Sequence, residues 1–143
     1  MSAMLEGYAG FADGTLALWE EALATDRLAP QRAERESAVR TSIKAFRGFA
    51  RVWATGRPRA WLCAGKYEWR GGRTRAAARA WEQSLRWSMR LRMPYEEALT
   101  HYEIARRTTA GAERAAHGAI AVTLFERLGA QHDLACARAV VSA

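Results

Sequence analysis

The sequence predicts an all-α protein built from antiparallel helical hairpins, and three observations lead to this prediction. Alanine and arginine are abundant while β-branched residues are few, which favours helices over strands. Proline and glycine interrupt the chain at regular places, and no stretch alternates between apolar and polar residues for long enough to form a strand. The 143 residues are 50% hydrophobic and 26% charged, so we expect one domain with its own core over residues 1–143.

The helix boundaries follow from the prolines and glycines. A proline in the first turn of a helix costs no hydrogen bond, and three prolines stand just before amphipathic stretches: Pro30, Pro58 and Pro94. Glycine favours helix ends, and four glycines stand where helices should stop: Gly56, Gly71, Gly72 and Gly129. These signals predict helices near residues 14–25, 31–54, 58–70, 75–91, 95–107, 112–128 and 133–141. Only a frayed turn is expected over residues 2–9.

Apolar side chains recur at steps of three and four within the predicted helices, as a single buried face requires. In the long helix near 31–54 they are Val39, Ile43, Phe46, Phe49, Ala50 and Trp53. The helix near 75–91 presents Ala77, Trp81 and Leu85 in the same way. Because the predicted linkers are only a few residues long, successive helices are expected to pack antiparallel as hairpins.

One of these hairpins resembles the tetratricopeptide repeat. Between Pro58 and Met89, large flat residues and small residues follow the spacing of that repeat. The matching residues are Trp61, Gly65, Gly72, Ala77, Trp81 and Ser84. The resemblance implies a short solenoid of stacked hairpins, in which residues 58–91 form the best-matching repeat.

A second resemblance covers roughly residues 40–135. Segments 56–61, 93–96 and 124–130 are similar to the C-terminal helical region of large bacterial signalling proteins. In those proteins a tetratricopeptide-like tail follows a regulatory ATPase, sometimes together with a cyclase or kinase domain. No cyclase, kinase or ATPase motif occurs in this chain. The resemblance therefore implies a regulatory tail, either as a stand-alone relative or as a fragment of a larger regulator.

The basic residues are concentrated in the centre of the chain. The net charge is +7, yet 14 basic and two acidic residues lie between Arg40 and Arg92, while the remainder holds 8 basic and 13 acidic residues. This asymmetry predicts either an anionic partner or an internal electrostatic match. Most of the cations are arginines, as codon drift in a GC-rich genome would also produce, so a compositional origin stays open.

The resemblance to the repeat also implies a concave groove, lined by one face of the first helix of each hairpin, in which such proteins hold extended peptides. The residues placed in this groove are Arg59, Leu62, Lys66, Trp69, Arg70, Tyr102 and Arg106. Their basic side chains are expected to bind the carboxylates of an acidic peptide. The alternative is that the arginine stems cover apolar surface while their charged heads stay in water.

The sequence contains no catalytic, metal or cofactor signature. It has no glycine-rich phosphate loop, and His101, His117 and His132 have no ligand partner at metal-binding spacing. Cys63 and Cys136 lie far apart and are expected to be small buried thiols in a reducing, cytoplasmic compartment. We therefore expect no enzyme activity, no cofactor and no metal. No apolar run is long enough to cross a membrane.

The sequence thus predicts a non-catalytic protein–protein interaction or regulatory module of bacterial signalling, which binds an acidic peptide or a partner domain in a basic groove. Two other functions stay open. An arginine-rich surface with aromatic residues could bind nucleic acid through phosphate contacts and stacking, although no signature of a DNA- or RNA-binding fold is present. The chain could also be a structural tail that caps the solenoid of a larger ATPase- or cyclase-type regulator.

Overall fold

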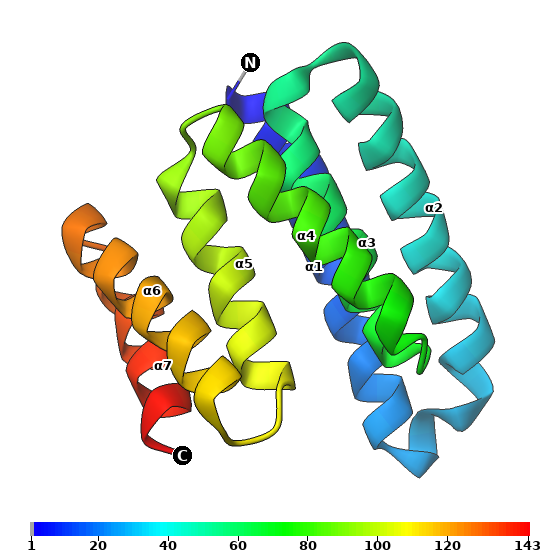
Figure 1. The fold of residues 1–143 in the computed structure, drawn as a ribbon. Helices are drawn as coiled ribbons and strands as arrows, with labels where there is room; N and C mark the ends of the chain where they lie inside the picture. Colours follow the sequence, from blue (N-terminus) through cyan, green and yellow to red (C-terminus); the bar gives the residue numbers. More distant parts are fainter. Residues whose placement is uncertain (1) are drawn as a thin grey trace. The chain divides into compact units, whose positions relative to one another are not determined.

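The computed structural model describes residues 2–143 (Figure 1). Its elements in chain order are α1 (Ser2–Ala24), η1 (Asp26–Gln31), α2 (Arg32–Val52), η2 (Ala54–Gly56), α3 (Arg57–Arg70), α4 (Thr74–Arg90), α5 (Pro94–Arg107), α6 (Ala112–Leu128) and α7 (Gln131–Ser142). The two η segments are short 3₁₀ helices, and no residue between Ser2 and Ala143 belongs to a strand. The all-α prediction is confirmed.

The predicted helix boundaries agree closely with the structure from α2 onward, because they rest on local signals. Pro58 and Pro94 occupy the first turns of α3 and α5, where their missing N–H groups cost nothing. Gly129 ends α6 in the left-handed conformation, with φ at 67°. Among residues 2–143, no helix is both long enough and apolar enough to cross a membrane.

The first helix differs from the prediction. The frayed turn expected over residues 2–9 is wrong, since α1 is one continuous helix from Ser2 to Ala24. The physical reason is packing against α2: the ring of Tyr8 stacks on Phe49 with centroids 4.9 Å apart, and Ala9 is almost fully buried. The exposed glycines of this segment lower its intrinsic helix propensity, but burial of the opposite face compensates for that loss.

The chain divides into two compact units, and the division falls within α4, between Ala80 and Trp81. The first unit packs α1, α2 and α3 around one core. One cluster of buried apolar residues forms this core: Ala9, Ala12, Leu16, Trp19, Val39, Ile43, Phe46, Phe49, Ala50, Ala60, Cys63, Ala64 and Ala80. Within this core, a hydrogen bond of 2.8 Å between Thr15 and Ser42 joins α1 to α2 and satisfies two buried hydroxyl groups.

The second unit, from Trp81 to Ala143, contains α5, α6 and α7. Figure 1 shows that these helices follow one another as antiparallel neighbours, joined by short turns. Their core is small and consists of Ala98, Ala121, Phe125, Leu134 and Ala137. The alanines allow close approach of the helices, and Phe125 is fully buried at their centre.

Candidate anion-binding site

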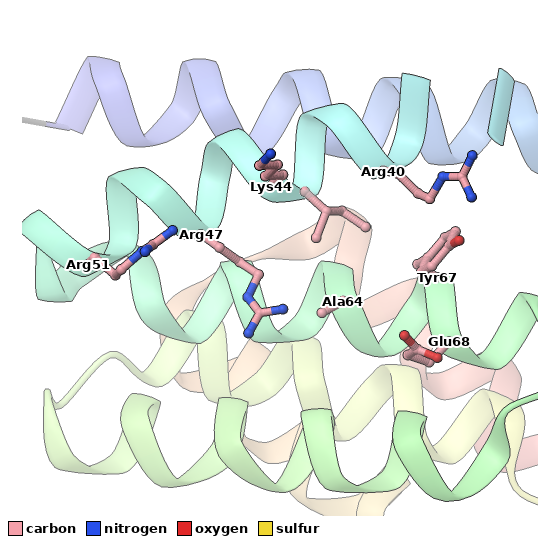
Figure 2. A pocket seen from close by; sticks show the side chains of 8 residues that line it. Arg40, Lys44, Arg47, Arg51, Ala64, Tyr67 and Glu68 are labelled. Carbon is pink, nitrogen blue, oxygen red and sulfur yellow. The ribbon is translucent and has the colours of Figure 1, made fainter. Parts of the chain in front are cut away.

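A pocket opens between α2 and α3 in the first unit, with a volume of about 260 Å³ (Figure 2). The α2 side of the pocket holds four cationic side chains: Arg40, Lys44, Arg47 and Arg51. These residues recur at steps of four, three and four, so they form one row along one face of the helix. All four side chains are exposed, whereas the lining residues Ile43 and Ala64 are buried.

The charges of this row are not balanced by ion pairs. Within residues 2–143, none of the four cations forms an ion pair with a carboxylate. The guanidinium of Arg47 instead lies over the ring of Trp61, 5.0 Å from its centroid. Such stacking holds the planar group in place and leaves its N–H edges able to donate hydrogen bonds. We call Arg40, Lys44, Arg47 and Arg51 the α2 cation row.

The polar residues on the α3 side of the pocket already have partners. The Tyr67 hydroxyl donates to Glu36 Oε1 at 3.0 Å. Burial, followed by this hydrogen bond, raises the pKa of Tyr67 above its ordinary value, so the phenol stays neutral. Glu68 forms an ion pair with Arg73 and is the one carboxylate among the described residues that line the pocket. The pocket is therefore strongly positive.

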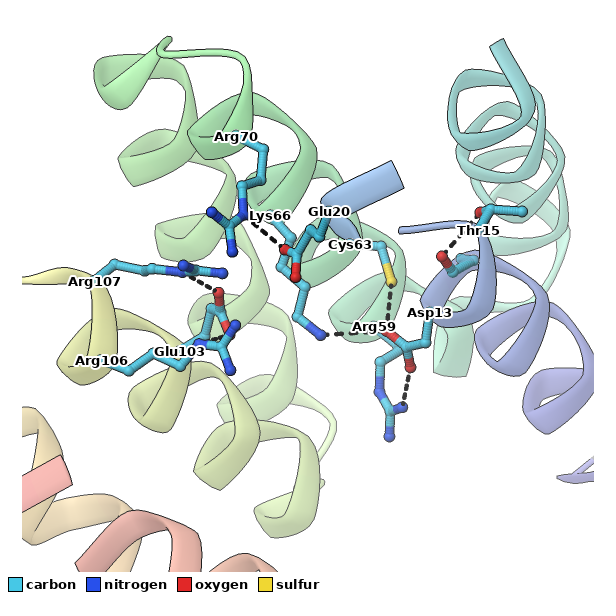
Figure 3. Close-up of polar contacts among 11 residues, drawn as sticks. Asp13, Thr15, Glu20, Arg59, Cys63, Lys66, Arg70, Glu103, Arg106 and Arg107 are labelled. Atoms are coloured by element: carbon cyan, nitrogen blue, oxygen red, sulfur yellow. Dashed lines mark hydrogen bonds and ion pairs between the residues drawn. The ribbon is translucent and has the colours of Figure 1, made fainter. Parts of the chain in front are cut away.

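The cations predicted on α3 lie elsewhere on the first unit and meet carboxylates of α1. Lys66 Nζ lies 3.2 Å from Asp13 Oδ1, and Arg59 lies 3.5 Å from Asp13 Oδ2 (Figure 3). Arg70 Nε donates to Glu20 Oε1 at 2.9 Å. The internal electrostatic match, which the charge distribution left open as one of two explanations, thus exists for these three residues.

The other residues predicted for the groove divide between the two units. Leu62 of α3 is buried with 2% of its surface exposed, and Trp69 is half-buried. Tyr102 and Arg106 belong to the second unit, where the Arg106 guanidinium lies 5.7 Å from the Tyr102 ring centroid. Arg106 also pairs with Glu103 at 3.1 Å. That the seven residues predicted for the groove bind a partner remains a prediction.

Cys63 lies among these charges but has the properties of a core residue. Its Sγ is 3.8 Å from Asp13 Oδ1, and its side chain is fully buried. Burial, together with the negative charge of Asp13, raises the pKa of the Cys63 thiol to about 12. A thiol with that pKa is almost entirely protonated at neutral pH, so it is a poor nucleophile and a poor metal ligand.

The second unit contains two buried polar clusters. Glu103 is 2% exposed, accepts a hydrogen bond from Arg107 Nε at 2.9 Å and forms an ion pair with Arg106 at 3.1 Å (Figure 3). His101 and His117 face each other with their Nδ1 atoms 2.7 Å apart. Burial, together with the charge of His117, lowers the pKa of His101 to about 4. Within residues 2–143, no group of three or more histidine, cysteine, aspartate or glutamate side chains could hold a metal ion.

Sequence reasoning missed both the α2 cation row and the histidine pair. The row was visible in the sequence, because positions 40, 44, 47 and 51 share one face of the helix predicted near 31–54. The histidine pair left no local signal, since its two members lie on α5 and α6 and meet only when these helices pack.

Comparison with known proteins gives no relative: no family model, no curated protein and no solved structure matches the chain.

Proposed function

We propose that this chain is a non-catalytic, cytoplasmic interaction module of bacterial signalling that binds an acidic segment of a partner protein in the α2–α3 pocket. The observation that carries the proposal is the α2 cation row, which lines a concave site and has no carboxylate partner among residues 2–143. Cations held close together repel one another, and an anionic ligand relieves this repulsion while forming charge-assisted hydrogen bonds.

The proposed site differs in place from the groove that the sequence suggested, but the chemistry is the same. The α3 cations Arg59, Lys66 and Arg70 have Asp13 and Glu20 as neighbours, so an acidic ligand there would compete with groups of the chain itself. At the α2 cation row, the carboxylate of the lining, Glu68, is paired with Arg73 and not with a member of the row. We also propose that the hairpins stack as a short tetratricopeptide-like solenoid, an arrangement supported by the short turns between consecutive helices.

Nucleic acid is the second candidate ligand, because a row of cations can also follow a phosphate backbone. The nearby aromatic residues favour the peptide. Sequence-independent binding of a single strand relies on exposed ring faces for base stacking. Here one ring of the region, Trp61, is covered by Arg47, and Tyr67 is held by Glu36.

The test uses two double variants with equal changes in charge. Arg40→Glu with Lys44→Glu reverses two members of the α2 cation row, whereas Arg75→Glu with Arg79→Glu reverses two exposed arginines of α4 at the same spacing. Binding of a labelled peptide rich in aspartate and glutamate is followed by fluorescence anisotropy. Because two charge-assisted hydrogen bonds are lost, we expect the first variant to bind at least about tenfold more weakly. The α4 variant should bind like the parent.

Equal weakening of both variants would show that only the net charge matters, and the proposal would then be wrong. Single-stranded DNA of similar length and label is the second probe. If the DNA binds tightly and the peptide does not, the nucleic-acid function replaces the one proposed. Circular dichroism of both variants checks that their helical content equals that of the parent.

A further inference from the structure

We propose that the α2–α3 pocket recognises a phosphoryl group, borne by a phosphorylated side chain of the partner segment. This inference rests on the proposed function and names the chemistry of the ligand at the same site. It follows from the number of cations, from the preorganisation of one of them and from the length of the row.

The number of cations exceeds what one carboxylate can neutralise. Arg40, Lys44 and Arg47 lie within two helical turns of one another on the wall of the pocket, and Arg51 continues the row. A carboxylate bears one negative charge and pairs with two cations at Asp13 and at Glu103 of this chain, fewer than the four cations of the row. A phosphoryl group bears about −1.5 to −2 charges at neutral pH and offers three strong acceptor oxygens. The pocket thus matches a phosphoryl group better than a single carboxylate.

Arg47 is already held in a position suited to such a ligand. Its guanidinium is stacked on Trp61, and Figure 2 shows it extending from α2 toward Ala64 on α3. An arginine that is fixed before binding loses less rotamer entropy when it forms a bidentate pair. The buried side chains of Ile43 and Ala64 lie beside it, so the charges interact next to apolar, poorly screening surface.

The opposite wall does not neutralise these cations. Within residues 2–143, Glu68 is the one carboxylate in the lining, and it is paired with Arg73. Since a water molecule occupies about 30 Å³ in the liquid, a volume of about 260 Å³ has room for a phosphoryl group together with part of its hydration shell.

The length of the row points to a phosphorylated segment rather than to free phosphate. Arg40 and Arg51 are eleven residues apart in α2, which corresponds to about 16 Å along the helix axis. That span exceeds the reach of one phosphate ion, so the outer cations are placed for acidic residues that flank the phosphorylated one. Free phosphate shares the phosphoryl chemistry but can use only part of the row.

The experiment compares two labelled peptides with the same acidic flanks, one with a central phosphoserine and the other with a central glutamate. Because the second phosphate ionisation has a pKa near 6, we expect the phosphoserine peptide to bind about tenfold more tightly at pH 7.5 and to lose most of that advantage at pH 5. Unlabelled inorganic phosphate should displace it only at concentrations at least about a hundredfold higher than the unlabelled phosphopeptide requires. Displacement at equal concentrations would overturn the assignment to a segment.

Arg47→Lys keeps the charge but removes the planar fork. We expect it to weaken binding of the phosphoserine peptide several-fold more than binding of the glutamate peptide, whereas Arg75→Lys on α4, the matched control, should bind both peptides like the parent. The parent protein could bind both peptides with equal affinity, and the Arg40→Glu, Lys44→Glu variant could bind neither. That result would overturn the phosphoryl inference and keep the proposed function. If neither peptide binds the parent protein, both proposals are wrong.

Discussion

Asp13 Oδ1 of α1 lies 3.2 Å from Lys66 Nζ of α3, although 53 residues separate the two in the sequence. The other oxygen of the same carboxylate pairs with Arg59, whose side chain is only 12% exposed. One acidic residue from the N-terminal helix thus pairs with two cations of the basic centre. These contacts join α1 to α3 directly. They also show that part of the excess positive charge in the centre of the chain stabilises the fold by pairing with an acidic residue of the N-terminal helix.

Asp13→Asn should lower the free energy of unfolding by about 1–2 kcal/mol, because two partly buried cations lose their countercharge while the volume is kept. Chemical denaturation at low salt measures the change, and 1 M salt should reduce it by screening. Asp26→Asn is the control, since the carboxylate of Asp26 is fully exposed where it pairs with Arg32 and its loss should cost little. Equal effects of the two substitutions would contradict the assigned role of Asp13.

Two glycines should respond to alanine with opposite signs. A Cβ atom at Gly56 would lie 2.8 Å from Cδ1 of Phe49, whose ring is buried, so Gly56→Ala should destabilise the protein by about 1–3 kcal/mol. A Cβ atom at Gly10 would meet nothing within 4 Å on the exposed face of α1, so Gly10→Ala should stabilise it by about 0.5–1 kcal/mol. Thermal unfolding measures both effects. If the Tm of both variants shifted in the same direction, this description of the two sites would be wrong.

The elements that the sequence predicted well are those with local causes. Pro94 and Gly129 mark helix ends whatever the chain does elsewhere, because a missing N–H group and a left-handed residue act within one turn. The first half of α1 was missed because its glycines are a local signal against helix. Contact of Tyr8 with Phe49, which is distant in sequence, stabilises it.

The candidate site was only partly predictable for the same reason. The sequence correctly located an excess of cations in the centre of the chain, but which cations find a carboxylate depends on packing between helices. Arg70 pairs with Glu20 across 50 residues, whereas Arg40 forms no ion pair with a carboxylate among residues 2–143. Periodicity gives the face on which a residue lies and not the identity of the helix that packs beside it.

The two cysteines should differ sharply toward thiol reagents. Cys63 is fully buried with its pKa raised to about 12, whereas Cys136 is only half-buried, so the expectation of buried thiols is met fully only at Cys63. A disulfide-exchange reagent at pH 8 should modify one thiol of the native protein, and the second only after denaturant is added. In Cys136→Ser the fast reaction should disappear, and fast reaction of that variant would show that Cys63 is accessible.

The facing histidines should make the stability of the protein depend on pH below about 6.5. Burial, with a contribution from His117, lowers the pKa of folded His101 to about 4, while the unfolded chain keeps the ordinary value near 6.5. Between these values the unfolded state binds more protons, so the free energy of unfolding is highest above pH 6.5 and falls as the pH drops toward 4. The full difference amounts to about 3 kcal/mol, with the steepest loss between pH 6 and 4.

Denaturant unfolding at pH 7, 6 and 5 measures this dependence. Carboxylates that titrate in the same range also contribute to it, and comparison of histidine variants with the parent isolates the contribution of His101. His101→Gln removes the titrating ring, so its free energy of unfolding should fall less steeply with decreasing pH than that of the parent. His132→Gln removes an exposed histidine of α7 and should leave the slope unchanged. The ring proton signals of His101 should titrate with a midpoint near pH 4. If His101 titrated with a midpoint near pH 6.5, its ring would be solvated rather than buried against His117. The same conclusion would follow if the unfolding free energy of His101→Gln depended on pH as steeply as that of the parent.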